Sequence, residues 1–243
     1  GIDVGGADIK LNEDGSYTLA LGCSDMGTGC DTIIAQFVAD SLDTDIDNIA
    51  VFGVDTDTSP YDSGSYASST TYLTGMAAVK AAEQMREKLL QLAAKILEED
   101  ITKLEFDGKR VFCEETGKEV SLFDLATASM VNNEIALEVT YSHSSPVSPP
   151  PFMAACAEVE VDPETGAIEL LDYTACVDCG TVVNTNLARV QTEGGLLQGI
   201  GMTLYEDVWY NEKGVNLSNS LMQYKIPTRL DFDKIRVEFE SSY

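Results

Sequence analysis

The sequence predicts an α+β protein built from mixed sheets with packed helices and divided into two sub-lobes. Apolar residues recur with the two-residue period of strands in some segments and with the three-to-four-residue period of helices in others. The stretch 142–152 is rich in Ser and Pro, a composition typical of a linker. We therefore expect sub-lobes at 1–141 and 153–243.

The first sub-lobe is predicted to open with a β-hairpin followed by a turn and a helix. Residues 9–21 alternate between apolar and polar positions around an Asp-Gly turn, as two paired strands do. A Gly-Thr-Gly turn at 27–29 then leads into a helix at 31–42 whose apolar residues recur at four-residue steps. Glycine lets such a turn bring backbone N–H groups close to an anionic ligand, although many turns contain it for steric reasons alone.

The remaining elements follow from the same two periods. In chain order we predict a buried strand at 49–54, the longest helix at 71–99, a small hairpin at 101–121, a short helix at 122–130, strands at 135–141, 153–161 and 167–174, a helix at 186–205, and last strands around Val208 and at 235–239. The helix at 186–205 contains four glycines, each of which costs about 1 kcal/mol relative to Ala. We expect a neighbouring element or a ligand to lie against its backbone.

The charge balance excludes two classes of partner. The chain has 15 Lys and Arg against 41 Asp and Glu, a net charge of −26. Such a surface repels nucleic acid and anionic membranes, so we expect neither as a partner. The sequence contains no apolar run long enough for a membrane helix and no signal-peptide pattern, and we expect a cytoplasmic protein.

Histidine and cysteine offer little for catalysis or metal binding. His143 is the only histidine, which excludes sites built from two of them, and we predict no metal ligand in this chain. The six cysteines are irregularly spaced and are expected to be reduced and mostly buried. Cys176 and Cys179 have redox or zinc spacing, but without a second pair or a helix start beside them we favour a packing role.

Three stretches of small residues, at 26–29, 64–69 and 183–195, offer amides, hydroxyls and the side chain of Gln191 with hardly a titratable group among them. The long polar loop at 55–70 is either a solvated surface loop or a segment that lines a ligand. The common ATP and NAD fingerprints are absent. These stretches suit the binding of a large polar cofactor better than acid-base catalysis.

Five motifs occur in a fixed order along the chain. They are DMGTGCDTIIAQ at 25–36, DTSPYDSGSYASSTT at 57–71, AEVEVDPETG at 157–166, VDCGTVVN at 177–184 and VQTEGGLLQGIG at 190–201. In their order and spacing these motifs resemble those of the xanthine dehydrogenase and aldehyde oxidase family of molybdenum hydroxylases. The part that the chain resembles is the C-terminal molybdopterin-binding portion of the family's molybdenum-binding subunit. The resemblance implies a fold of the molybdenum cofactor-binding domain type.

The resemblance also implies a cofactor and its contacts. The cofactor would be molybdopterin, in bacteria usually as the cytosine dinucleotide, used to hydroxylate a heteroaromatic ring or an aldehyde with water-derived oxygen. The residues that would contact it are Gly27, Thr28, Gly29, Tyr66, Ala67, Ser68 and Gln191. Thr28 stands where relatives commonly carry Gln, and Ser69 where many bacterial relatives carry Arg.

The family's upstream half and its catalytic Glu would lie outside the chain, the latter beyond Tyr243. We therefore expect a piece of a longer polypeptide or, as the weaker alternative, a split subunit, inactive alone. The implied partners are the upstream half of the molybdenum subunit, domains or subunits carrying iron–sulfur clusters and FAD, and a small-molecule substrate. A different class of function also stays open, namely a non-catalytic acidic assembly module that retains the fold.

Overall fold

The computed structural model describes residues 3–132, 136–231 and 234–241. They divide into two compact units, Gly1–Ser148 and Pro149–Tyr243, each described by itself below. Both units combine helices with mixed or antiparallel sheets, so the predicted α+β class is confirmed. None of the described helices is long and apolar enough to span a membrane.

A four-stranded mixed sheet forms the base of unit 1. The central strand β1 (Val4–Leu11) pairs antiparallel with β2 (Tyr17–Leu21) on one side and with β7 (Glu138–Ser144) on the other. Strand β3 (Ile49–Phe52) lies parallel to β2 at the edge. Because β7 pairs through Ser144, it extends three residues into the segment expected to be a linker, and His143 lies opposite Gly5 in a strand instead of in a loop.

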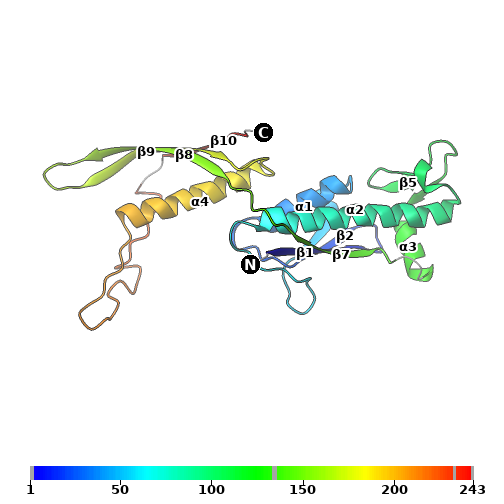
Figure 1. The fold of residues 1–243 in the computed structure, drawn as a ribbon, viewed down its shortest axis with the longest axis horizontal. Coiled ribbons are helices and arrows are strands. Elements are labelled where there is room, and N and C mark those ends of the chain that lie inside the picture. The colour runs from blue at the N-terminus through cyan, green and yellow to red at the C-terminus, as the bar shows by residue number, and fades with distance from the viewer. Residues whose placement is uncertain (1–2, 133–135, 232–233, 242–243) are drawn as a thin grey trace. The chain divides into compact units, whose positions relative to one another are not determined.

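Two helices cover one face of this sheet (Figure 1). They are α1 (Cys30–Ser41) and α2 (Thr70–Leu97), and each buries one apolar stripe against the sheet and the other helix. The side chains at the centre of this core are fully buried: Ile9, Tyr17, Leu19, Leu21, Ile34, Val38, Met85 and Leu89. The four-residue spacing of the two helices is therefore explained by packing alone.

A small antiparallel sheet lies at the C-terminal end of α2. It consists of β4 (Glu105–Phe106), β5 (Arg110–Phe112) and β6 (Glu119–Ser121), and it is followed by α3 (Leu122–Asn132). Two short 3-10 turns, η1 (Ile46–Asn48) and η2 (Ile101–Lys103), complete unit 1. The hairpin predicted over 101–121 is thus a three-stranded sheet.

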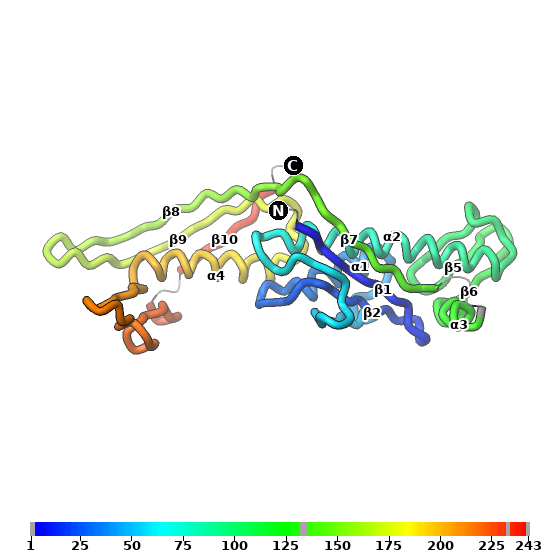
Figure 2. Tube along the Cα trace, turned by 60° about the horizontal axis from the view of Figure 1, so that its bottom comes forward, coloured from blue at the N-terminus to red at the C-terminus, as the bar shows by residue number. Residues whose placement is uncertain are grey.

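Unit 2 is a three-stranded sheet and one helix. A long antiparallel hairpin joins β8 (Phe152–Val161) to β9 (Ile168–Asp178), and β10 (Ile235–Phe239) pairs parallel with β9 (Figure 2). Helix α4 (Thr185–Leu204) packs on this sheet. The predicted strand around Val208 is wrong, because among the described residues there only an isolated bridge between Tyr210 and Asn216 forms.

The core of unit 2 is small. Its described buried hydrophobic residues are Ala175, Leu196, Ile200 and Val237, while strand β8 is exposed along its whole length. In α4, an added Cβ would meet nothing within 4 Å at Gly194, Gly195 or Gly199. The expected close neighbour is therefore found only at Gly201, where Glu206 and Pro227 approach.

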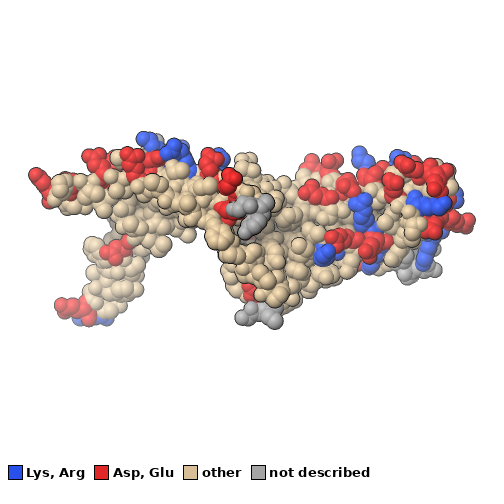
Figure 3. Space-filling view, turned by 45° about the horizontal axis from the view of Figure 1, so that its top comes forward, with Lys and Arg blue, Asp and Glu red and all other residues tan. Residues whose placement is uncertain are grey.

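Charge and thiols are distributed unevenly. On the face shown in Figure 3, acidic side chains are spread over both units with fewer basic ones among them. The cysteines were expected to be mostly buried, but Cys156, Cys176 and Cys179 in unit 2 are exposed. Only the three cysteines of unit 1 are buried, because unit 2 has too little core to cover its own.

Candidate functional site

The turn that joins β2 to α1 is held by its own aspartate. Asp25 Oδ1 accepts hydrogen bonds from the backbone N–H groups of Gly27 at 2.9 Å and Gly29 at 3.1 Å. Gly27 and Gly29 have φ values of 102° and 75°, which other residues adopt only with strain. The glycines of the motif thus serve the turn, and their amides already have an acceptor within the chain.

The charges beside this turn are two carboxylates. Burial disfavours the charged form of Asp25, but the Gly27 and Gly29 amides outweigh it and lower the pKa of this carboxyl. Burial, and then the negative charge of Asp25, raise the pKa of Asp31. Oxygen and sulfur atoms of Asp25, Cys30 and Asp31 lie within 4.8 Å of one another. That grouping alone assigns no metal, because acidic clusters are common without one.

Thr28, predicted to flank the cofactor, turns its hydroxyl inward. Its Oγ1 is shielded from solvent and has no hydrogen-bond partner of good geometry among the described residues. Met26, two residues before Thr28 in the same turn, is 70% exposed. The surface that this turn offers a ligand therefore includes the side chains of Asp25 and Met26.

A second predicted segment lies directly against the first. Ser65 Oγ donates to the carbonyl of Ser24 at 2.6 Å and accepts from the Ser24 N–H at 3.0 Å. Two hydrogen bonds from one hydroxyl fix the loop at 64–69 to the start of the turn. The structure thus brings Gly27, Thr28 and Gly29 into the same neighbourhood as Tyr66, Ala67 and Ser68.

Asp62 holds the long loop on the sheet. Its Oδ2 accepts from the N–H of Gly6 at 3.0 Å and from Thr74 Oγ1 at 2.8 Å, and its Oδ1 accepts from the N–H of Gly64 at 2.8 Å. The loop passes so close that a Cβ at Gly6 would lie 2.3 Å from the Tyr61 carbonyl oxygen. Sequence reasoning missed this aspartate, and the Gly-Gly pair within strand β1 was the available signal.

The loop reaches α2 through two residues in the left-handed backbone conformation. Ala67 and Ser68 both have positive φ values, 54° and 57°, and both are exposed. The N-cap residue Ser69 makes no side-chain capping hydrogen bond. The positive end of a 28-residue helix therefore faces outward without a side-chain acceptor of its own.

Neighbouring side chains fix the loop before this helix start. Tyr66, which is 51% exposed, donates from its hydroxyl to Asp3 Oδ1 at 2.5 Å. This hydrogen bond raises the pKa of Tyr66. Two consecutive exposed residues in the left-handed conformation thus lie between a loop held by side chains and a helix start without a side-chain cap.

Gln191, the seventh predicted residue, belongs to unit 2. It is exposed on α4, whose first turn is capped by Asn184 Oδ1 accepting from the Leu187 N–H at 3.1 Å. The cap lies in the small-residue stretch expected to contact a ligand. Its observed role is to begin the helix that presents Gln191.

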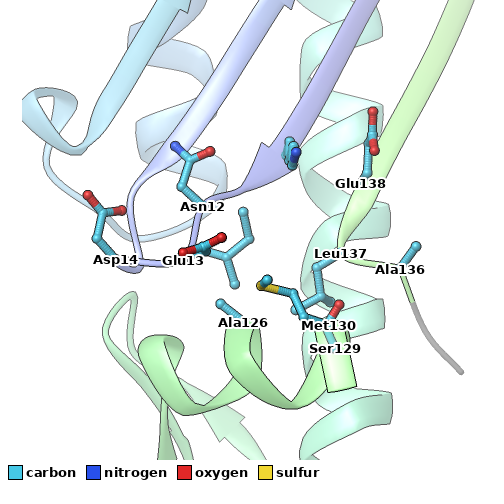
Figure 4. A pocket seen from close by; sticks show the side chains of 11 residues that line it. Asn12, Glu13, Asp14, Ala126, Ser129, Met130, Ala136, Leu137 and Glu138 are labelled. Carbon is cyan, nitrogen blue, oxygen red and sulfur yellow. The ribbon is translucent and has the colours of Figure 1, made fainter. Parts of the chain in front are cut away.

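A separate cleft of about 660 Å³ lies at the other end of the unit 1 sheet (Figure 4). It is lined by the β1–β2 turn, including Asn12 and Asp14, and by Ala126 and Met130 of α3. Since β1 and β2 are antiparallel, this end of β1 is remote from the turn that follows β2. None of the predicted site residues lines the cleft.

Unit 1 thus presents small residues at the starts of two helices, an arrangement typical of proteins that bind a polar, anionic ligand. The comparison with family models is specific. Residues 2–232 match the molybdopterin cofactor-binding domain, and the chain belongs to this family. The predicted family resemblance is confirmed.

Characterised relatives agree. The chain is 31% identical over 233 residues to the gamma subunit of the 6-hydroxypseudooxynicotine dehydrogenase complex of Paenarthrobacter nicotinovorans, covering 93% of this chain and 29% of the relative. It is 36% identical over 227 residues to the probable hypoxanthine oxidase XdhD of Escherichia coli K12, covering 93% of this chain and 24% of that protein. The chain therefore spans about a quarter to a third of these relatives.

Solved structures share the fold. CO dehydrogenase from Oligotropha carboxidovorans matches 98% of this chain and 30% of its own with a TM-score of 0.86 at 29% identity. Quinoline 2-oxidoreductase from Pseudomonas putida 86 matches 99% of this chain and 31% of its own with a TM-score of 0.87 at 27% identity. The relatives are molybdenum hydroxylase oxidoreductases of several kinds, and the predicted fold type is confirmed.

Proposed function

We propose that this chain holds the molybdopterin cofactor of a molybdenum hydroxylase at the uncapped start of α2, beside the 25–29 turn. The observation that carries the proposal is the pair of hydrogen bonds between Ser65 and Ser24, which joins the two predicted segments. The starts of α1 and α2 belong to the two segments that these bonds join. Cofactor phosphates are anions, and helix N-termini with free amides bind anions.

The described residues fit such a group. The exposed left-handed residues Ala67 and Ser68 bring the backbone to the surface without large side chains. Asp25 is an anion close by that the amides of Gly27 and Gly29 keep ionised, which favours the start of α2 over the 25–29 turn as the place of a phosphate. Tyr66 and Met26 offer apolar surface to a pterin ring. Gln191, on α4 of unit 2, is the further contact that the family resemblance implies.

When bound, the cofactor would accept the electrons from the substrate and deliver the oxygen, which derives from water. This chain's residues bind and orient it, and none of them is assigned as a general base. For the complete protein we propose hydroxylation of a heteroaromatic or aldehyde substrate, supported by the oxidoreductase relatives and the family motifs. The cytosine dinucleotide form of the cofactor follows from the family resemblance.

The proposed partners are the upstream half of the molybdenum subunit and domains or subunits with iron–sulfur clusters and FAD. The gamma-subunit relative belongs to a named dehydrogenase complex, which supports an assembly of this kind. We propose further that the two units are sub-lobes of one cofactor-binding domain, and that the protein is cytoplasmic.

The substitution Ser68→Asp tests the cofactor site. Aspartate tolerates the left-handed conformation, and its charge near a helix start stabilises the helix, so the fold should be kept. The same charge repels a cofactor phosphate, and we expect retention to weaken by roughly tenfold, or ~1.4 kcal/mol. Molybdenum and released nucleotide are measured in the full-length protein expressed with cofactor supply.

The matched control is Gln84→Glu, which adds the same charge to an exposed position in the middle of α2. It should leave the molybdenum content unchanged. Equal cofactor content in Ser68→Asp and the wild type would show that the start of α2 does not bind the cofactor.

A further inference from the structure

Two buried thiols flank the 25–29 turn. Cys23, directly after β2, and Cys30, the first residue of α1, are 0% and 2% exposed. Their sulfur atoms lie 4.0 Å apart, with Cys23 donating toward Cys30 Sγ. Neither thiol has a place in the proposed cofactor contacts. The sulfurs need approach only to the bond length of about 2.05 Å for a disulfide to form.

The two thiols differ in reactivity. Cys30 occupies the start of a helix, where the positive end of the dipole favours a thiolate. The hydrogen bond from Cys23 chiefly lowers the pKa of Cys30, and the nearby Thr28 side chain contributes, while burial and the charges of Asp25 and Asp31 oppose the shift. The same pairing raises the pKa of Cys23. Cys30 is therefore the nucleophile of the pair.

A small oxidant has a short route to the pair. Residues 24–27 of the turn between the two cysteines are exposed, so the pair lies beneath a surface segment. Opening of this one turn uncovers both sulfurs, whereas Cys113 is buried in another part of the unit 1 core. Oxidation should thus select the pair over the third buried thiol of unit 1.

We propose that Cys23 and Cys30 are an oxidative modification site, converted by hydrogen peroxide into a disulfide that locks the 25–29 turn to the start of α1. The Cys30 thiolate attacks peroxide, an S–O bond forms, the O–O bond breaks, and the departing hydroxide takes up a proton as water. The Cys23 sulfur then attacks Cys30, the S–S bond forms, and the sulfenic oxygen leaves as a second water. Two electrons pass from the thiols to peroxide.

The sequence makes the product easy to detect. No Lys or Arg occurs between Lys10 and Lys80, so trypsin releases residues 11–80 as one fragment, whose only cysteines are Cys23 and Cys30. The purified full-length protein is treated with peroxide and its free thiols are alkylated. It is then digested with trypsin, and the mass of the fragment is measured by mass spectrometry. We expect it to carry no alkyl group, to be lighter by two hydrogen atoms, and to regain both alkylation sites after reduction with dithiothreitol.

Variants separate the roles of the two sulfurs. In Cys23→Ser, the sulfenic acid at Cys30 has no resolving thiol and should be trapped by dimedone. In Cys30→Ser, Cys23 should stay reduced, and the control Cys113→Ser should form the same disulfide as the wild type. A wild-type fragment that keeps two free thiols, a link to any other cysteine, or dimedone labelling at Cys23 in place of Cys30 would each overturn the proposal. These readouts do not depend on the cofactor.

Discussion

Asp62 is the residue on which the geometry of the candidate site most depends. Its three hydrogen bonds join the long loop to helix α2, which follows it, and to strand β1, which is distant in the sequence. A carboxylate suits this position because it only accepts hydrogen bonds, and three donors converge on it. Asp25 does the same for the amides of its own turn. The site is thus shaped by acceptors that a ligand never needs to touch.

The substitution Asp62→Asn should destabilise unit 1. Asparagine replaces one carboxylate oxygen with an NH₂ group. That group faces either the Gly64 N–H or the Gly6 N–H and the Thr74 hydroxyl, so at least one donor loses its acceptor, at a cost of about 1–3 kcal/mol. The change is measured as the free energy of urea unfolding by far-UV circular dichroism. Asp45→Asn is the control, since Asp45 is exposed and makes no capping hydrogen bond. Equal losses in both variants would contradict the role given to Asp62.

At the scale of elements, glycines determine how closely the loop lies on the sheet. A Cβ at Gly5 would meet the Thr74 backbone nitrogen at 2.4 Å, and one at Gly22 would meet the Pro60 carbonyl oxygen at 2.4 Å. Strands β1 and β2 thus approach the loop and α2 through backbone alone. This close approach fixes the direction in which the start of α2 faces.

We expect Gly6→Ala to loosen this contact. The added methyl group would lie 2.3 Å from the Tyr61 carbonyl oxygen, so the loop must shift, at a cost of about 1–3 kcal/mol. Hydrogen exchange should accelerate at the Gly64 amide and in β1. Gly53→Ala is the matched control, because its nearest neighbour would be Asp31 Oδ2 at 3.9 Å. Unchanged exchange in Gly6→Ala would mean that the loop is not held by this approach.

Helical and strand periods were enough to predict the main elements of unit 1, because its core is built from regular apolar stripes such as Ile34 and Val38 of α1. The strand around Val208 failed for the opposite reason. Trp209 and Tyr210 have strand propensity, but no partner strand among the described residues pairs with them beyond one bridge. Propensity without a partner does not make a strand.

The candidate site was predictable only in part. Motif order pointed to the segments around Thr28 and Ser68, which the structure brings together, while Gln191 lies in the other unit. Asp62 bonds to Gly6 across 56 residues and to Thr74 across 12, and Ser65 bonds to Ser24 across 41, so these contacts leave no local pattern in a sequence. Only three-dimensional structure shows such acceptors.

For the whole molecule, the two units differ in how far they can sustain their own folds. Unit 1 buries a continuous core contributed by its sheet and by α1, α2 and α3. Unit 2 buries four described hydrophobic residues and exposes large ones such as Met153 at 56% and Trp209 at 61%. The conformational entropy lost on folding is about 1–2 kcal/mol per residue for the backbone, which so small a core cannot offset.

We therefore predict that unit 1, expressed as residues 1–148, folds alone, whereas unit 2, expressed as residues 149–243, does not. Unit 1 should unfold cooperatively on heating and resist limited proteolysis. Unit 2 should lack a thermal transition and bind a hydrophobic dye, since its exposed apolar surface then has no cover. The same measurements on the full-length protein are the control. A cooperative transition in isolated unit 2 would show that its sheet and α4 are stable with so small a core, because no other part of the chain would then be present to cover the exposed apolar residues.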